Sequence, residues 1–541
     1  MRELGGGYLY KQLNKDVKEI NKVFISLFSV GIILVAIFIG INITKSSYAL
    51  FSDSITSVNT IEVTVAGKPL DESGANAPKL DSNMIPVYYD ETAEVWKKAD
   101  ENNTNKEYQW YDYDDKIWAN SVTVSSTNRT TYLNASPGTE IPMEDILTMQ
   151  VWVPRYKYKV WNYNADRTDR TARTAISEPQ EIEIVFEQGT SSTGEIECTD
   201  TISGTDGAKS ESCKIDNEEC TDSTCNNKYY THPAFTFGSE ELEGFWIGKF
   251  ELTGTISNIT TKPDLSSLTN QNISSFATNI MEMNDSGNQY GLSISTDTHM
   301  IKNMEWGAVA YLSHSKYGVN REVYINNSSN YYTGRSGGNV GGETPINGTY
   351  MDQTSTTQYN IYGYYTYDGY LLEYGTNTKS STKDLSKVAS TTGNIYGVYD
   401  MSGGAYNYVM GNIVSNNGST MMSGYTTSQN SEYTGIIYAS GSYTSYTGTY
   451  TYPDTKYYDK YSFGTSQSQR IRSKLGDGIK ETYNTSSYGW YSDNSSLAIS
   501  YGPWFIRGGH YSYGSSAGVF YSGSYFGNAS TDYSSRLVIT S

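Results

Sequence analysis

A long apolar run lies near the N-terminus, from Val23 to Ile43. It contains no charged residue, and its polar side chains are Ser26, Ser29 and Asn42. A helix of this length spans about 30 Å, which matches the apolar thickness of a bilayer. The pattern therefore predicts a transmembrane helix or signal anchor at residues 23–43.

The charges around this run predict its orientation. Residues 1–22 carry several Lys and Arg side chains, whereas Lys45 follows the run alone. Because basic flanks stay in the cytoplasm, we expect a cytoplasmic segment at 1–22, a linker at 44–59 and an extracellular C-terminal domain on a single-pass protein of the cell membrane. A cleaved signal peptide is the alternative, since Ser47 and Ala49 have the small side chains of a cleavage site. Cleavage after Ala49 would give a secreted protein.

Short alternating and aromatic runs follow, separated by turn-forming Asp, Asn, Gly and Lys residues. β-branched and aromatic side chains at hairpin spacing are typical of antiparallel strands. We therefore expect a small β-rich module at residues 60–145. Its predicted strands are Ile61–Ala66, Met84–Tyr89, Val95–Trp96, Trp110–Asp114 and Trp118–Val124.

Two stronger strands open the remainder of the chain. Met149–Val160 alternates on either side of Pro154, which predicts a bulge, and Glu181–Phe186 alternates throughout. Beyond them the sequence becomes polar and loop-rich. We expect one large domain at residues 146–541, with a cysteine-containing insertion at about residues 190–230.

The composition refines this picture. Hydrophobic residues make up 37% of the chain, yet 51 residues are Tyr, and disordered chains are poor in aromatic side chains. An ordered, β-rich and loop-rich protein is therefore expected. The net charge of −19 repels a phosphate backbone, so we expect no nucleic-acid partner.

The four cysteines of the chain all lie in the predicted insertion. Two disulfides in an exported chain are the first interpretation. Four thiolates binding zinc are the alternative, although the paired C-x-x-C spacing of structural zinc sites is missing. Three disulfide pairings are open among Cys198, Cys213, Cys220 and Cys225.

Four segments of the large domain carry recognisable motifs: Phe245–Thr253 (FWIGKFELT), Met304–Leu312 (MEWGAVAYL), Tyr396–Tyr408 (YGVYDMSGGAYNY), and Arg507–Gly509 followed by Ser535–Val538. Together and in this order they resemble the formylglycine-generating enzyme family, also called the sulfatase-modifying-factor domain. The resemblance implies an α+β fold of the C-type-lectin-like class with long loops. The positions that it marks as structural are Trp246, Trp306, Tyr399, Asp400, Gly403, Arg507, Gly508 and Gly509.

The resemblance does not extend to the family's chemistry. That chemistry uses a cysteine pair just after the R-G-G motif, where a thiolate is required as nucleophile or copper ligand. Residues 510–518 contain no cysteine, so we expect no enzyme of this kind. The family's calcium site falls at Gly404 and Asn407, where the expected carboxylate is missing. Calcium is therefore the one cofactor that the resemblance leaves open.

The C-terminal segment mixes Tyr with Ser, Gly, Asn and Asp. Antibody paratopes use the same mixture, because Tyr offers a large, stiff contact area and small residues let it adapt. In some C-type-lectin-like relatives of this enzyme family, retroelements diversify the segment between the R-G-G motif and the C-terminus. Ordinary surface and core tyrosines are the alternative interpretation. The expected ligand-binding residues are His510, Tyr511, Tyr513, Tyr521, Tyr525, Asn528, Asp532 and Tyr533.

These observations predict a membrane-anchored bacterial surface protein that binds an extracellular protein or glycan ligand through its C-terminal face, without catalysis. One alternative is an enzyme that keeps the fold and uses other chemistry. Its signature would be His510 close to Ser512 or Arg507 in a deep pocket. The other alternative is a structural component of the cell envelope or of a fibre.

Overall fold

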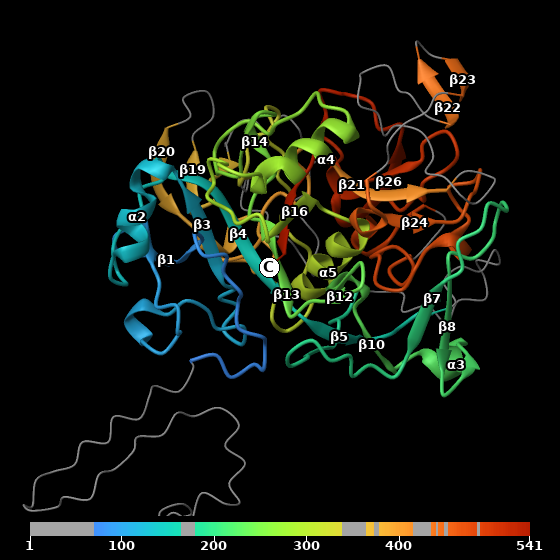
Figure 1. Ribbon diagram of the computed structural model, residues 1–541, viewed down its shortest axis with the longest axis horizontal. Coiled ribbons are helices and arrows are strands. Elements are labelled where there is room, and N and C mark those ends of the chain that lie inside the picture. The colour runs from blue at the N-terminus through green and yellow to red at the C-terminus, as the bar shows by residue number, and fades with distance from the viewer. Residues whose placement is uncertain are drawn as a thin grey trace, which may run out of the picture. The chain divides into compact units, whose positions relative to one another are not determined.

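The computed structural model describes residues 70–163, 179–337, 364–372, 378–414, 453–483 and 487–540, together with the strands at 434–439 and 442–447 (Figure 1). The predicted membrane segment at 23–43, the linker at 44–59 and the strand Ile61–Ala66 lie outside the described residues. Within the described ranges, no helix is both long and apolar enough to cross a bilayer.

The fold belongs to the α+β class and consists mostly of strands in several sheets, with few helices and long loops, as predicted. The described α-helices are α2 (Ser126–Asn134), α3 (Asp222–Cys225), α4 (Ile273–Met281) and α5 (Asn303–Ser313). The described 3-10 helices are η2 (Lys106–Tyr108), η3 (Pro233–Phe235), η4 (Glu282–Asn284), η5 (Leu385–Lys387), η6 (Thr455–Tyr457), η7 (Arg470–Arg472), η8 (Trp490–Ser492) and η9 (Gly514–Ser516).

Most strands outside the two main sheets form small antiparallel sheets. They are β10 (Tyr229–Thr231), β5 (Tyr156–Lys159) and β6 (Ile184–Phe186); β7 (Glu197–Asp200), β8 (Glu211–Ile215) and β9 (Glu218–Glu219); and β17 (Ser336–Gly337), β18 (Tyr364–Tyr365), β19 (Tyr370–Leu372) and β20 (Lys379–Lys383). Three hairpins complete the set: β11 (Thr236–Phe237) with β12 (Glu240–Glu241), β14 (Thr253–Thr255) with β15 (Asn258–Thr260), and β22 (Thr434–Ala439) with β23 (Ser442–Thr447).

A seven-stranded antiparallel sheet joins the two ends of the large domain. Its order is β16 (Asp297–Met300), β28 (Leu537–Thr540), β13 (Gly244–Gly248), β4 (Ile146–Pro154), β3 (Asn120–Val124), β1 (Ile85–Asp90) and β2 (Val95–Lys98). The last strand of the chain, β28, pairs with β13 on one side and β16 on the other. Because these partners are far apart in sequence, the sheet is completed only when the C-terminus is in place.

The predicted division at residues 145/146 falls inside this sheet. β3 and β4, on opposite sides of that boundary, are paired from Asn120↔Val151 to Val124↔Ile146. Strands β1 to β3 therefore share one sheet with the rest of the domain, and the residues from Pro69 onward form one compact unit.

Most predicted strands of the first 186 residues are present, but Trp110–Asp114 is not a strand. Its aromatic side chains are buried, with Trp110 and Tyr113 at 1% and 0% exposure. The backbone instead bonds to polar side chains: Trp110 N donates to Asn103 Oδ1 (2.9 Å) and Tyr113 N donates to Asp71 Oδ1 (2.8 Å). The aromatic run correctly indicated that this segment is buried. Its backbone N–H groups bond to the side chains of Asn103 and Asp71, and not to the backbone of a neighbouring strand.

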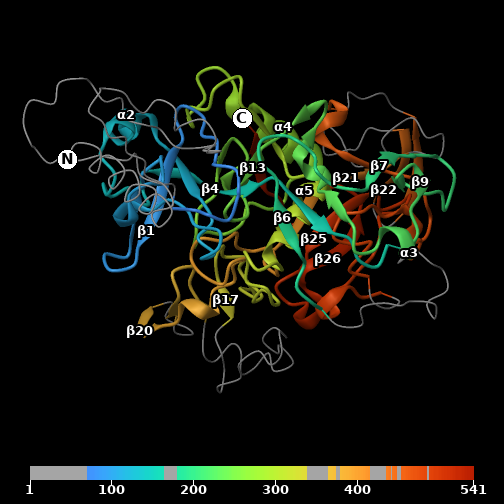
Figure 2. The ribbon, with the colours of Figure 1, turned by 90° about the horizontal axis from the view of Figure 1, so that it is seen from below.

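Helix α5 lies between the seven-stranded sheet and a mixed sheet made of β24 (Asp459–Tyr461), β21 (Tyr406–Ile413), β25 (Trp504–Gly508), β26 (Gly518–Tyr525) and β27 (Tyr533–Ser534) (Figure 1 and Figure 2). The helix covers the predicted segment Met304–Leu312, and all its residues are buried. Its Trp306 donates from Nε1 to Val519 O (2.8 Å). The guanidinium groups of Arg507 and Arg536 lie 5.9 and 5.7 Å from the Trp306 ring centroid, so these three motif positions share one core.

The side chain of Lys249 connects strands β13 and β3 with the segment at residues 394–408, which contains the motif Tyr396–Tyr408. It follows β13 directly and is fully buried. Its Nζ donates to Asn120 Oδ1 (2.7 Å), Ile395 O (2.6 Å) and Gly397 O (3.0 Å). Burial lowers the pKa of Lys249, but only the ammonium form has three N–H groups for these three acceptors. The rings of Trp96 and Tyr399 lie 5.2 and 5.3 Å from the same nitrogen.

We expect Lys249→Met to lower the free energy of unfolding by about 3–5 kcal/mol, because three buried acceptors lose their donor. Lys316→Met is the matched control. The Lys316 side chain is 58% exposed and lies 3.7 Å from Asp114, so its loss should cost at most about 1 kcal/mol. Thermal unfolding followed by circular dichroism compares the two variants. Equal shifts in midpoint would contradict the role assigned to Lys249.

Candidate functional site

The predicted ligand-binding segment begins where β25 ends. Gly508 and Gly509 both have left-handed backbones, with φ of +83° and +81°. A Cβ at position 509 would lie 2.7 Å from Ala517, so the chain can fold back on itself only without a side chain there. This turn leads into the loop at 510–517 and then into β26. The R-G-G motif therefore sets the direction in which the loop leaves the core.

Three side chains from distant parts of the chain meet at this loop. The hydroxyl of Tyr331 donates to Asp532 Oδ1 (2.7 Å) and lies 3.0 Å from His510 Nε2. The other ring nitrogen of His510, Nδ1, lies 2.9 Å from Ser512 Oγ. Tyr331 has a positive φ of +53°, a conformation that costs energy in a residue with a side chain. The surrounding contacts hold this strained residue between His510 and Asp532.

The direction of these hydrogen bonds follows from Asp532, whose carboxylate can only accept. The Tyr331 hydroxyl donates to it and therefore accepts from His510 Nε2–H. His510 Nδ1 then carries no proton and accepts from Ser512. Burial lowers the pKa of His510, and the charge of Asp532 opposes that effect in part.

A layer of buried tyrosines supports the loop from below. The ring of Tyr406 packs against His510 (5.3 Å between centroids), Tyr513 (5.5 Å), Tyr521 (5.7 Å) and Tyr533 (5.0 Å). Tyr521 and Tyr533 are only 4% and 7% exposed. These two predicted ligand-binding residues therefore lie beneath the surface, where they hold the outer rings in place.

The other predicted residues are accessible. Tyr513 is 47% exposed, Asn528 is exposed, and His510, Tyr511, Tyr525 and Asp532 are half-buried. The ring of Tyr525 packs against that of Tyr533, with centroids 4.3 Å apart and planes inclined by 30°. The accessible set forms what we call the tyrosine face: Tyr331, His510, Tyr511, Ser512, Tyr513, Tyr525, Asn528 and Asp532. Tyr331 was missed at the sequence level, because nothing in its local sequence distinguishes it from neighbouring tyrosines.

The predicted calcium position lies under this face. A Cβ at Gly404 would come within 2.8 Å of Glu251 Oε1, so the Glu251 carboxylate occupies the adjacent space. Asn407 Nδ2 (3.0 Å), Ala405 N (3.2 Å) and the Ser267 hydroxyl all donate to that carboxylate. Asn407 turns its Nδ2 donor toward that carboxylate, while its Oδ1 is buried without a hydrogen-bond partner. Calcium needs several converging oxygen ligands, and the donors bonded to Glu251 compete with an ion for its carboxylate.

The same carboxylate belongs to a buried charge group. Burial, and after it the charge of Asp400, raises the pKa of Glu251 to about 8, while Arg536 acts in the opposite direction. Asp400 Oδ1 accepts from Asn326 Nδ2 (2.7 Å) and Gly334 N (2.8 Å). Asp400 has a left-handed φ of +59°, and its side chain pins the loops around it. The motif residues at 394–408 thus act as structural supports of the face.

The cysteine insertion contains two disulfides, Cys198–Cys213 and Cys220–Cys225. The first joins directly opposite residues of β7 and β8. Every cysteine of the chain is used in these two bonds, so the zinc alternative is wrong for this structure.

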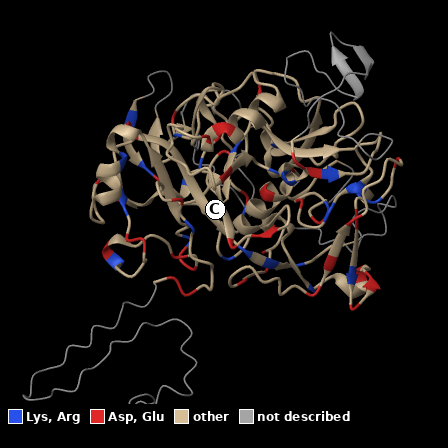
Figure 3. Ribbon diagram, in the orientation of Figure 1, with Lys and Arg blue, Asp and Glu red and all other residues tan. Residues whose placement is uncertain are grey.

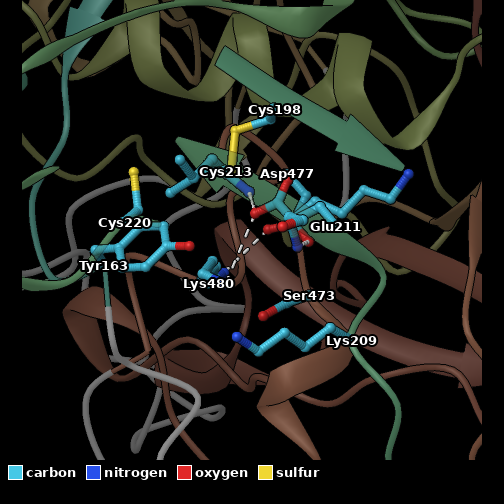
Figure 4. A network of polar contacts seen from close by, with 12 residues as sticks. Tyr163, Cys198, Lys209, Glu211, Cys213, Cys220, Ser473, Asp477 and Lys480 are labelled. Carbon is cyan, nitrogen blue, oxygen red and sulfur yellow. Dashed lines mark hydrogen bonds and ion pairs between the residues drawn. A yellow bond between two sulfur atoms is a disulfide. The ribbon is translucent and has the colours of Figure 1, made fainter. Parts of the chain in front are cut away.

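Glu211 attaches this insertion to the main body. Its carboxylate accepts from Leu475 N (2.8 Å) and lies 3.7 Å from Lys480 Nζ, with both side chains 6% exposed (Figure 4). An adjoining cleft of about 840 Å³ is lined by both signs of charge. Lys474 in that cleft already pairs with Asp200 at 2.6 Å, so part of its charge is matched within the protein.

The chain matches no protein-family model, and no curated protein matches it.

We expect Asp532→Asn to lower the pKa of His510 further, because the carboxylate charge that raises it is removed. The chain has only 4 histidines, so ring-labelled NMR spectra can follow each one. His232 and His314, whose pKa values burial lowers to about 3 and about 4, should not respond. A rise in the pKa of His510, or no change, would contradict the assigned hydrogen-bond chain.

The sign of the stability effect follows from the same shift. The folded pKa of His510 lies below the ordinary value of 6.5. Its neutral form therefore contributes stability above pH 6.5, and this contribution is lost as the pH falls through the folded pKa.

Proposed function

We propose that this chain is a membrane-anchored, extracytoplasmic bacterial surface protein that binds a protein or glycan ligand through the tyrosine face. The observation that carries the proposal is the arrangement of that face. Accessible aromatic and amide groups, including Tyr511, Tyr513 and Asn528, stand on a rigid layer of buried rings. Rigid Tyr side chains lose little entropy when they bind, which favours recognition.

The core of the domain supports the proposed C-type-lectin-like, formylglycine-generating-enzyme-like fold. Its motif segments are hydrogen-bonded neighbours: β13 pairs with β28, and β21 pairs with β25. Trp306, Arg507 and Arg536 pack together around α5. The motif segments that carry the family resemblance thus meet in one core beneath the tyrosine face.

The proposed location rests on two features of the chain. The apolar run at 23–43 with its basic N-terminal flank favours an anchor with the domain outside. The two disulfides are typical of an oxidising compartment.

The proposal predicts that the double substitution Tyr511→Ala and Tyr513→Ala weakens ligand binding at least about tenfold, as expected when aromatic anchors are removed. The measurement uses the full-length protein on arrays of glycans and extracellular proteins. Tyr488→Ala is the matched control, because Tyr488 is 44% exposed and lies outside the tyrosine face. Unchanged binding by the double variant would contradict the proposal.

A second candidate function has one observation in its favour. Ser512, His510, Tyr331 and Asp532 form a continuous hydrogen-bond chain, as a nucleophile and base would. The backbone N–H groups around Ser512 are nevertheless engaged: Tyr511 N bonds to Gly404 O (2.9 Å) and Tyr513 N to His510 O (2.9 Å). An acyl-transfer site needs free donors for the oxyanion, so this chain favours positioning over catalysis.

We therefore expect a fluorophosphonate probe not to label Ser512. The unmodified protein and the Ser512→Ala variant should then show the same background labelling. Mass spectrometry of the treated full-length protein gives the readout. Stoichiometric labelling at Ser512 that disappears in His510→Gln would support the enzyme and contradict the non-catalytic proposal.

A further inference from the structure

A separate hollow of about 630 Å³ lies beside β1 and β2, at the end of the seven-stranded sheet. Tyr88 of β1 and Tyr108 of η2 line it from two sides. Their rings are half-buried, with centroids 6.3 Å apart and planes inclined by 54°. The two rings therefore form an open corner rather than a stack.

Backbone contacts make this corner rigid. Gly138, with a φ of +89°, lies against the Tyr108 ring, and a Cβ there would come within 2.7 Å of Tyr108 Cε1. Gly138 N bonds to Lys98 O, and Lys98 N bonds to Thr139 O, each at 2.8 Å. Asp100 N bonds to Tyr108 O, also at 2.8 Å. Tyr108 is thus held by the loop at 137–139 and by the end of β2 before any ligand arrives.

Acidic and basic residues are interspersed over the described ribbon (Figure 3), so the charge close to the hollow is set first by its own side chains. Lys97, the one basic residue lining it, lies 2.6 Å from Asp90 Oδ2. Asp90 also accepts from the backbone N–H groups of Thr92 and Ala93, at 2.9 and 3.0 Å. The charges of Asp90 and Lys97 therefore neutralise each other within the lining of the hollow.

Two further carboxylates, Glu91 and Glu107, line the same hollow and are exposed. Among the described residues, no basic side chain forms an ion pair with either of them. The hollow therefore combines two tyrosine rings with two carboxylates that no lysine or arginine neutralises, and one of these carboxylates, Glu107, is hydrogen-bonded to Tyr108. The chain as a whole carries a charge of −19, which adds attraction for a cation.

We propose that this hollow binds the ammonium group of an organic cation, such as a choline group, a lysine side chain or a protonated amino sugar. The negative faces of Tyr88 and Tyr108 attract a cation within about 6 Å of each ring centroid. Glu91 and Glu107 supply the counter-charge, and the remaining volume accepts the rest of the molecule. An apolar ligand gains nothing from these two carboxylates, and a neutral sugar can donate hydrogen bonds to them but leaves their charge unmatched. The site is independent of the tyrosine face.

The test is calorimetric titration of the full-length protein with choline and with its uncharged isostere 3,3-dimethyl-1-butanol. We expect choline to bind and the isostere to bind at least tenfold more weakly. Trimethyl-lysine beside Nε-acetyl-lysine, and glucosamine beside N-acetylglucosamine, identify the source of the ammonium group. Equal binding of charged and neutral partners, stronger binding of a neutral disaccharide, or no binding of any ammonium compound would overturn the proposal.

Variants locate the site. Tyr108→Ala should weaken choline binding at least tenfold, Tyr108→Phe should retain it, and Glu107→Gln should weaken it several-fold. Glu107 is exposed, so its variant keeps the test valid even if Tyr108→Ala does not fold. Tyr513→Ala on the tyrosine face should have no effect on choline binding, and an effect there would place the cation at the other site. Choline affinity unchanged in Tyr108→Ala and Glu107→Gln would also overturn the proposal.

Discussion

The buried ammonium of Lys249 is the interaction on which the arrangement of this domain depends. Its three hydrogen bonds join β13 to β3 through Asn120, and to the motif loop through Ile395 and Gly397. The backbone of the same residue also takes part: Lys249 N bonds to Met149 O and Tyr399 N bonds to Lys249 O. A buried charge is costly unless its hydrogen bonds are satisfied. Any arrangement that buries Lys249 without its three acceptors is therefore strongly destabilised. One side chain thereby fixes the position of the motif loop, whose residues support the tyrosine face.

The structure separates a frame from a face. The frame is closed by β28 beside β13 and is pinned by buried polar groups such as Glu251 and Asp400, which have little freedom to change. The face consists of side chains that stand on Tyr406, Tyr521 and Tyr533 and reach solvent. A surface of this design can change its outer residues with little cost in stability, since surface substitutions away from buried contacts usually change it by less than about 0.5 kcal/mol. This division agrees with the binding function proposed above.

Sequence patterns predicted the strands and the helix that depend on neighbouring residues along the chain. β1, β2, β3 and β4 show β-branched and aromatic runs, and helix α5 coincides with the motif at Met304–Leu312. Trp110–Asp114 was wrongly predicted as a strand, because acceptors on Asn103 and Asp71 took the place of a strand partner. The predicted separation of residues 60–145 could not reveal that β3 pairs with β4, since pairing is decided by tertiary contacts.

The candidate site was predicted only in part, because tertiary contacts decide which of its residues are buried. Its segment followed from the composition after Gly509, but composition does not distinguish the buried Tyr521 and Tyr533 from the exposed Tyr513. Tyr331 reaches His510 from 179 positions away through a strained backbone, and no local pattern signals such a contact. The disulfide pairing likewise depends on the register of β7 and β8, in which Cys198 lies opposite Cys213.

The most direct test of the account is site-specific photo-crosslinking of the full-length protein on its native cell surface. A photoreactive amino acid is placed at position 513 on the tyrosine face and, as a control, at position 219, where the Glu219 side chain is 67% exposed on the cysteine insertion. Binding through the tyrosine face predicts that position 513 captures one defined protein or glycan and that position 219 does not. Equal capture at both positions, or none at 513 while the ligand is bound, would contradict binding through the tyrosine face.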